Sequence, residues 1–273
     1  MTLERRSRFQ LGRVMSERPT RLLSRANRDL ARDGIWSWTI PALAARLPDG
    51  TTFRTCRAAG VCSQVCFARS GTYNFPAVKA AHVRNLLFTL EDPEGWEQAM
   101  TAELSHPKFA GAHVRIHAAG DFYSAAYARA WLRIIRATPN TSFYAYTKEV
   151  MLHDRILEPE RPPNAVWIIS LGGIYDRYVD LHRHRVCDVF PTETEIEHSG
   201  WHSQAESDLL AAYGPAPVAM AANQIPHLQR RQGDRRFSEW QREVDRARGD
   251  STDRPRRRRR IAIAHPVGAT DKL

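Results

Sequence analysis

The feature that most constrains the fold is an alternation of strand-like and helical segments through the middle of the chain. Apolar residues, many of them β-branched or aromatic, concentrate in five short segments, residues 113–119, 142–147, 165–171, 185–190 and 216–222. Between the first two segments, Tyr127, Trp131 and Ile134 recur at helical spacing within residues 123–137. Strands that alternate with helices pair in parallel. The sequence therefore predicts an α/β fold, either a TIM-like (β/α) barrel or a partial barrel.

Charge and composition divide the chain into three parts. We expect a basic arm over residues 1–35, a β/α catalytic-type domain over 36–250 with a cysteine loop at 51–75, and an arginine-rich tail over 251–273. Within the domain, residues 36–45 are apolar and predict the first core segment. Further helices are expected over about 77–91, 96–104, 203–213 and 234–250.

The basic segments indicate a nucleic-acid partner. The net charge is +10 over 273 residues, nine of the first 32 residues are arginine, and five arginines stand in a row at 256–260. Arginine pairs with phosphate through a planar, bidentate fork, and basic blocks of this kind commonly bind nucleic acid. The alternative is a solvated tail that only aids solubility. The sequence has no apolar run of membrane-spanning length and no signal-peptide core, so we expect a cytoplasmic protein without membrane contact.

Polar residues follow the ends of the predicted strands. In parallel β/α folds the reactive groups gather at these carboxyl ends, so they are expected to share one face. The candidates are Asp121, residues 146–148 including Tyr146 and Lys148, residues 170–173 including Gly172 and Gly173, and Asn223 with Gln224.

Each candidate also has a structural explanation. Asp121 is a favoured residue type for the N-cap of the helix that begins near Phe122. Lys148 could be an exposed lysine at a helix start, and the two glycines could form a simple turn. Asp176 could stand at a helix N-terminus. His117 lies within a predicted strand and could be a core histidine with its hydrogen bonds satisfied.

Three of the four cysteines, Cys56, Cys62 and Cys66, are spaced C-x5-C-x3-C. Disulfides are not expected without a secretion signal. Clustered thiols in a glycine-containing loop suit a metal, either zinc or an iron–sulfur cluster. Cys187 is the predicted fourth ligand. The rivals for that role are His182, His184, His198 and His202. The alternative is a set of reduced structural cysteines.

Two of these motifs resemble the phage gene product 88 family. They are the cysteine triplet followed by an aromatic residue and alanine, and a strand ending in IHAAGDFYS before a helix and an aromatic-Y-T strand end. The resemblance covers about residues 38–225. The chain departs from the family pattern at residues 220–232, MAANQIPHLQRRQ, where further cysteines are expected.

Some members of that family resemble tRNA-guanine transglycosylases. The resemblance therefore implies a β/α barrel that exchanges guanine in phage DNA, more than in tRNA, for a 7-deazaguanine base such as 7-cyano-7-deazaguanine. A phage-encoded enzyme of this kind would work in the host cytoplasm and help phage DNA to evade restriction. The metal would then be structural, because base exchange needs no Lewis acid.

Base exchange needs a carboxylate that attacks C1′ and a second acid or base. Asp121 is the predicted nucleophile or general base, and Asp176 is the predicted second carboxylate. The expected substrate-binding residues provide stacking, backbone approach or polar contacts to a flipped base; they are Phe122, Tyr146, Lys148, Gly172, Gly173 and Asn223.

Two other classes of function remain open. The first is an iron–sulfur enzyme of radical-SAM type acting on nucleic acid or nucleosides, because a cysteine triplet precedes a helix and a strand that ends in a glycine motif. Its spacing is C-x5-C-x3-C instead of C-x3-C-x2-C. The second is a non-catalytic nucleic-acid-binding protein stabilised by a metal.

Overall fold

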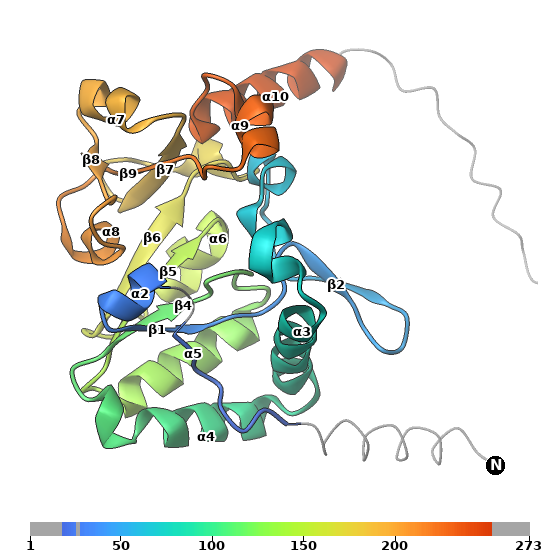
Figure 1. Ribbon diagram of the computed structural model, residues 1–273, viewed down its shortest axis with the longest axis vertical. Helices are drawn as coiled ribbons and strands as arrows, with labels where there is room; N and C mark the ends of the chain where they lie inside the picture. The colour runs from blue at the N-terminus through green and yellow to red at the C-terminus, as the bar shows by residue number, and fades with distance from the viewer. Residues whose placement is uncertain (1–17, 26–27, 253–273) are drawn as a thin grey trace, which may run out of the picture.

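The core of the protein is a seven-stranded parallel sheet, seen in the computed structural model (Figure 1), which describes residues 18–25 and 28–252. The strand order is β1-β4-β5-β6-β7-β9-β8, and every neighbouring pair is parallel. The strands are β1 (Ile35–Trp38), β4 (His113–Ile116), β5 (Ser142–Thr147), β6 (Ala165–Ser170), β7 (Val186–Phe190), β8 (His202–Ser203) and β9 (Val218–Ala221). A short antiparallel pair, β2 (Ala44–Arg46) and β3 (Thr52–Arg54), lies outside this sheet. The predicted α/β class is confirmed.

Helices connect most of these strands. The α-helices are α2 (Arg28–Arg32), α3 (Pro76–Glu91), α4 (Pro93–Leu104), α5 (Ala125–Ala137), α6 (Val150–Leu152), α7 (Glu193–Ser199), α8 (Leu209–Tyr213), α9 (Pro226–Gln232) and α10 (Phe237–Thr252). The 3₁₀ helices are η2 (Val61–Gln64), η3 (Phe67–Arg69), η4 (Gly71–Asn74), η5 (Pro107–Phe109) and η7 (Asp176–Tyr178), and η6 (His153–Leu157) is a π-helix. Figure 1 shows α9 and α10 beside the segment that contains the cysteines.

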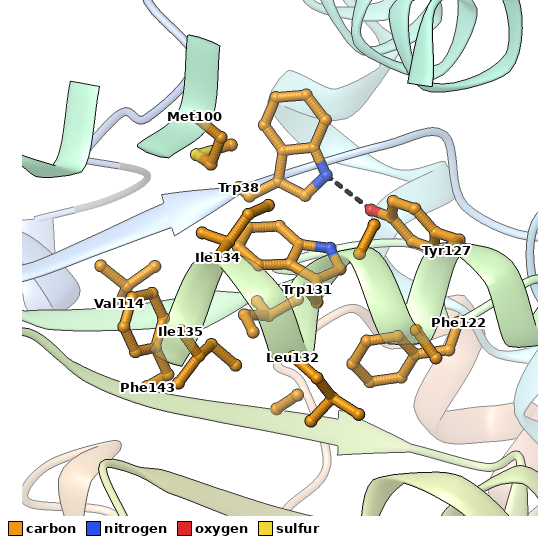
Figure 2. Close-up of a cluster of buried hydrophobic side chains, with 14 of the residues drawn as sticks. Trp38, Met100, Val114, Phe122, Tyr127, Trp131, Leu132, Ile134, Ile135 and Phe143 are labelled. Carbon is orange, nitrogen blue, oxygen red and sulfur yellow. Dashed lines mark hydrogen bonds between the residues drawn. The ribbon is translucent and has the colours of Figure 1, made fainter. Parts of the chain in front are cut away.

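The largest hydrophobic core lies between one face of the sheet and helices α3, α4 and α5. The apolar face of α5 carries Trp131, which packs against Trp38 of β1 and Trp96 of α4. Figure 2 shows this cluster, including the hydrogen bond from Trp38 Nε1 to the Tyr127 hydroxyl at 2.8 Å. The side chains in this layer are fully or nearly fully buried, so the layer fixes the register of α5 against β4 and β5.

The opposite face of the sheet is covered by α2 and α8. Tyr144, Ile168 and Cys187 from the strands pack there with Ala211 and Ala212 of α8. The segments at the two edges of the sheet also meet. Arg32, before β1, donates to the Glu206 carbonyl at 2.9 Å, and the Ser207 hydroxyl donates to Asp33 at 2.7 Å. Residues 174 positions apart are thereby joined across this face.

The five strands predicted from the sequence are all present, within a few residues of their expected bounds. The helix expected over 203–213 is wrong in its first half. Ser203 belongs to β8, whose pairing with β9 takes the backbone groups that a helix would need, and the helix α8 begins only at Leu209. The expected arm is described at residues 18–25 and 28–35, where Leu22, Leu23 and Leu30 are buried. The arginine run at 256–260 lies outside the described residues.

No helix in the described part of the chain is both long and apolar enough to cross a membrane.

Candidate functional site

A solvent-accessible pocket lies at the carboxyl ends of the strands. Cys56, Cys62 and Cys66 line it together with Asp121 and Lys148. These residues come from the loop after β1, the end of β4 and the end of β5. The expectation that polar strand ends share one face is therefore met at Asp121 and Lys148, and the cysteine loop lies at the same face.

Asp121 is almost completely buried and joins two strand ends. Its Oδ1 accepts hydrogen bonds from the Thr147 hydroxyl at 2.7 Å and from the Phe122 amide at 2.7 Å, and its Oδ2 accepts from the Lys148 amide at 2.9 Å. Burial raises the pKa of Asp121, although these hydrogen bonds oppose the change. Asp121 does not cap the following helix. The cap of α5 is Ser124, whose hydroxyl accepts from the Tyr127 amide.

Lys148 is a half-buried cation with a fixed position. Its ammonium donates to the Ser170 carbonyl at 2.8 Å, the Ser170 hydroxyl at 2.8 Å and the Leu171 carbonyl at 2.6 Å. The interpretation as an exposed helix-start lysine is wrong, because all three donors of the ammonium are used. The charge of Lys148 lowers the pKa of Cys62 and of Cys66, against the larger effect of burial.

The cysteine loop is attached to the strand ends through its backbone. The Gly172 carbonyl accepts from the amides of Gly60 at 3.2 Å and Cys62 at 3.3 Å, and the Ala58 amide donates to Glu149 at 2.9 Å. Burial raises the pKa of Glu149 to about 7. Helix α10 adds a further contact, because Gln241 accepts from the Val61 amide at 2.8 Å. These bonds hold the loop in one position over the sheet.

Gly60 and Gly172 are required by this attachment. A Cβ at Gly60 would lie 2.0 Å from Gln241 Oε1 and 2.8 Å from the Gly172 carbonyl oxygen. Gly172 has φ +93°, and a Cβ there would lie 2.8 Å from the ring of Phe237. The Gly172-Gly173 turn therefore packs against the cysteine loop and bonds to its backbone. Neither glycine lines the pocket.

Gly60→Ala is expected to destabilise the protein by about 1–3 kcal/mol, because the methyl group forces Gln241 or the loop backbone to move. Denaturant unfolding measures the effect. The matched control is Gly249→Ala in α10, where a Cβ meets no atom within 4 Å and alanine favours the helix. Equal stability of the two variants would show that the contact between loop and α10 does not hold the loop.

The three loop cysteines are half-buried, and their thiols are close enough to influence one another. Burial raises the pKa of Cys56 to about 12, and it raises the pKa values of Cys62 and Cys66. The three sulfur atoms do not all lie within 4.8 Å of one another. A single tetrahedral zinc ion with Zn–S bonds of about 2.3 Å needs sulfur atoms about 3.8 Å apart. In an iron–sulfur cluster each thiolate binds a different iron, so the sulfur atoms stand farther apart. Among the described residues, the three loop thiols therefore do not meet the spacing of a single-ion site.

The structure separates the other predicted site residues into two groups. Tyr146 and Asn223 line the pocket. Phe122 is fully buried in the main core, and Asp176 accepts from the Gly172 and Gly173 amides at 2.7 and 2.9 Å. Cys187 is buried on β7, with its sulfur 4.0 Å from Gln204 Oε1. None of these last three lines the pocket.

Several residues that line the pocket are not marked as site residues by the sequence, and two of them are an arginine and a histidine. Arg115 of β4 lines the pocket, and its Nη1 is paired with Asp208 at 3.0 Å. His117 also lines it and has φ +65°. Its Nε2 forms a hydrogen bond of 2.9 Å with the Tyr127 hydroxyl, which also accepts from Trp38 Nε1. Burial lowers the pKa of His117 to about 3, so the ring is neutral. The alternation of HVRI along β4 is the signal that could have placed Arg115 on the inner face.

A second group of potential metal ligands lies away from the pocket. His153, Asp154 and His184 have ligand atoms within 4.8 Å of one another. His184 Nδ1 accepts from the Asp180 amide at 3.0 Å, so the neutral ring carries its proton on Nε2 and donates it to Asp154 at 3.0 Å. His153 Nδ1 lies 2.8 Å from the same carboxylate oxygen. In this arrangement both ring nitrogens of His184 are engaged in hydrogen bonds, whereas His153 Nε2 lies 3.9 Å from Glu158, beyond hydrogen-bond distance.

Comparison with known proteins places this chain in a family. The family model described as Gene product 88 matches residues 21–254, which include every residue that lines the pocket. The Gene 88 protein of Mycobacterium phage L5 is 32% identical over 127 residues, which make up 41% of this chain. The match spans only 52% of that relative. No solved structure matches the chain.

Proposed function

The chain belongs to the gene product 88 family, and we propose that it is an iron–sulfur enzyme that uses S-adenosylmethionine to act on nucleic acid or nucleosides. One observation carries the proposal. Three thiols from a single loop line the same pocket as the buried carboxylate of Asp121 and the fixed cation of Lys148.

The order of the strands supports the same proposal. Six parallel strands, β1, β4, β5, β6, β7 and β9, follow one another across the sheet in chain order, and the cysteine loop follows the first. The hydrogen bonds that join residues 32–33 to residues 206–207 support a sheet curved into a partial barrel. Three cysteines before a helix, followed by a strand that ends in a glycine motif, are typical of radical-SAM enzymes.

The residues of this chain would prepare the site in three ways. When bound, the cluster would supply an iron open to S-adenosylmethionine and one electron for its reductive cleavage. The Lys148 charge favours the thiolate forms of Cys62 and Cys66, which are the forms that bind metal. The Leu43 amide lies 3.3 Å from Cys56 Sγ and donates to it. Asp121 offers a negative charge for a cationic ligand.

Anaerobic reconstitution with iron and sulfide tests the proposal. We expect about four irons per chain and a visible charge-transfer absorption. Cys56→Ala, Cys62→Ala and Cys66→Ala should each lose the cluster. Cys187→Ala is the matched control and should keep it, because Cys187 lies outside the pocket. A colourless wild-type protein that takes up only zinc, or loss of the cluster in Cys187→Ala alone, would contradict the proposal.

A DNA-guanine transglycosylase with a 7-deazaguanine substrate is the second candidate, and Asp121 favours it. A carboxylate at the pocket could attack C1′ and form a covalent glycosyl intermediate. Asp176, the predicted second carboxylate, does not line this pocket, so another group would have to act as the general acid, and the loop cysteines would then hold a structural metal. Exchange of labelled guanine into duplex DNA or tRNA by an iron-free protein would favour this candidate over the first.

A nucleic-acid substrate is proposed from the charge of the chain. The net charge is +10, and the longest arginine run stands close to the end of the sequence. Arginine contacts with phosphate give affinity that falls with salt concentration without choosing a sequence. A purified chain that binds DNA and RNA with no salt dependence would argue against such contacts.

A further inference from the structure

The inner wall of the pocket contains a cation that the proposed function has not used. Arg115 is the third residue of β4, and it lies on the same face of the sheet as Tyr144, its neighbour in register on β5. Asp121 lies beyond the end of β4, whereas Arg115 lies within it. Arg115 is therefore deeper in the pocket than the carboxylate and the strand-end lysine.

The plane of the Arg115 guanidinium is fixed from two sides. Its Cζ lies 4.8 Å from the centre of the Tyr146 ring, and its Nη1 donates to Asp208 Oδ2 at 3.0 Å. Asp208 is itself held by the Tyr144 hydroxyl at 2.5 Å and the Tyr146 hydroxyl at 2.9 Å. Gln204 Nε2 also donates to Asp208, at 3.2 Å. A guanidinium held in this way loses little conformational entropy when it binds a ligand.

One edge of the same guanidinium has no partner among the described residues. Nε is buried and makes no hydrogen bond, and Nη2 makes none either. A buried N–H without an acceptor costs about 1–3 kcal/mol, and native structures seldom keep one without a reason. Nε and Nη2 form the edge of arginine that binds two oxygens of a carboxylate or phosphate in parallel.

The charges around the pocket favour an anion at this edge. The ionisable side chains that line it, apart from the thiols, the Tyr146 phenol and the neutral His117, are Arg115, Lys148 and Asp121. Lys148 is committed to three carbonyl or hydroxyl oxygens, so its charge remains while its donors are used. Arg115 is the cation in this set that still has donors to offer.

We propose that the Nε–Nη2 edge of Arg115 anchors an oxyanionic group of the substrate, a phosphate or a carboxylate, in the inner part of the pocket. This inference rests on the proposed function, which identifies the pocket as an active site. It adds that the substrate carries an oxyanion, as a nucleotide or a carboxylated base does, and that a neutral nucleoside binds more weakly. Asp208, Tyr144 and Tyr146 are positioning residues, since they act by holding Arg115.

The Arg115 Nε–H group can be observed directly by NMR. In the full-length ¹⁵N-labelled chain without added iron, its signal is assigned as the one lost in Arg115→Lys. Sodium phosphate and sodium acetate are titrated separately, with sodium chloride as the ionic-strength control. We expect a saturable shift of this signal with phosphate or acetate and none with chloride. A shift with phosphate would indicate that the bound group of the substrate is a phosphate, and a shift with acetate would indicate a carboxylate.

Thermal stabilisation by the same salts provides the second measurement. Arg115→Lys keeps a cation beside Asp208 but loses the fork, so its affinity for the effective oxyanion should fall about tenfold or more. The matched control is Arg185→Lys, which alters another half-buried arginine, one bonded to the carbonyls of Leu210, Ala211 and Gly214 outside the pocket. Arg185→Lys should keep wild-type affinity, even if its melting temperature is lower.

The outcomes separate this inference from the proposed function. Because no cluster or turnover is needed, oxyanion binding by a chain that fails to take up iron would leave the subsite standing and remove the iron–sulfur proposal. A chain that assembles the cluster while neither oxyanion shifts the Arg115 signal would overturn the subsite alone. A shift produced by S-adenosylmethionine, with phosphate and acetate inactive, would assign the edge to the co-substrate and also overturn the inference.

Discussion

Trp131→Ala is expected to lower the free energy of unfolding by about 3–5 kcal/mol. Trp131 is fully buried at the centre of the cluster in Figure 2, where its ring lies 5.3 Å from that of Trp96 and 6.4 Å from that of Trp38. The substitution removes the largest side chain of α5 and leaves a cavity that its rigid aromatic neighbours cannot fill. Urea unfolding followed by circular dichroism measures the change.

The control for this prediction is Trp131→Phe. A phenylalanine ring occupies most of the same volume, so the expected loss is smaller than that of alanine. A loss below about 1 kcal/mol for Trp131→Ala would mean that α5 does not pack on β1 and α4 as described, because a buried tryptophan cannot be removed at so small a cost.

Asp121→Asn is expected to reduce turnover about 100-fold while the iron content of the reconstituted protein stays at the wild-type level. The variant removes the carboxylate charge from the pocket, and S-adenosylmethionine carries two cationic groups that this charge can bind. Asp121 accepts three hydrogen bonds, and in asparagine one of the two accepting oxygens is replaced by an NH₂ donor. At least one hydrogen bond is therefore lost, and a stability loss of about 1–3 kcal/mol is expected as well.

Asp188→Asn separates the two effects. Asp188 is fully buried on β7 and accepts hydrogen bonds from the Val189 and Ser238 amides, yet it does not line the pocket. It should keep its turnover, because the substitution replaces a buried carboxylate outside the pocket. Wild-type turnover in Asp121→Asn, measured beside this control, would remove Asp121 from the proposed iron–sulfur mechanism.

Local patterns were sufficient to predict most of the sheet. The segment 142–147 is rich in aromatic residues and forms β5 over the same residues, and 165–171 forms β6 with one residue fewer. The pattern was insufficient where a strand is very short. β8 has only two residues, His202 and Ser203. It pairs with β9, where the partner of His202 is Val218, 16 positions later in the chain.

Side-chain roles depended on contacts that the sequence does not display. Asp121 and Ser124 are both favoured N-cap residues, and the sequence offers no means of choosing between them. The Thr147 hydroxyl and the Lys148 amide, at the end of the next strand, donate hydrogen bonds to the Asp121 carboxylate. Asp121 therefore does not cap α5, and Ser124 does. The pairing of Arg115 with Asp208 joins residues 93 positions apart, and no local pattern indicates it.

Cleavage of S-adenosylmethionine tests the central claim most directly. The reconstituted protein is reduced under anaerobic conditions, and the formation of methionine and 5′-deoxyadenosine is followed by mass spectrometry. The account predicts both products from the wild type and from Cys187→Ala, and neither from Cys62→Ala. A wild-type protein that holds its full complement of iron and leaves S-adenosylmethionine intact would contradict it.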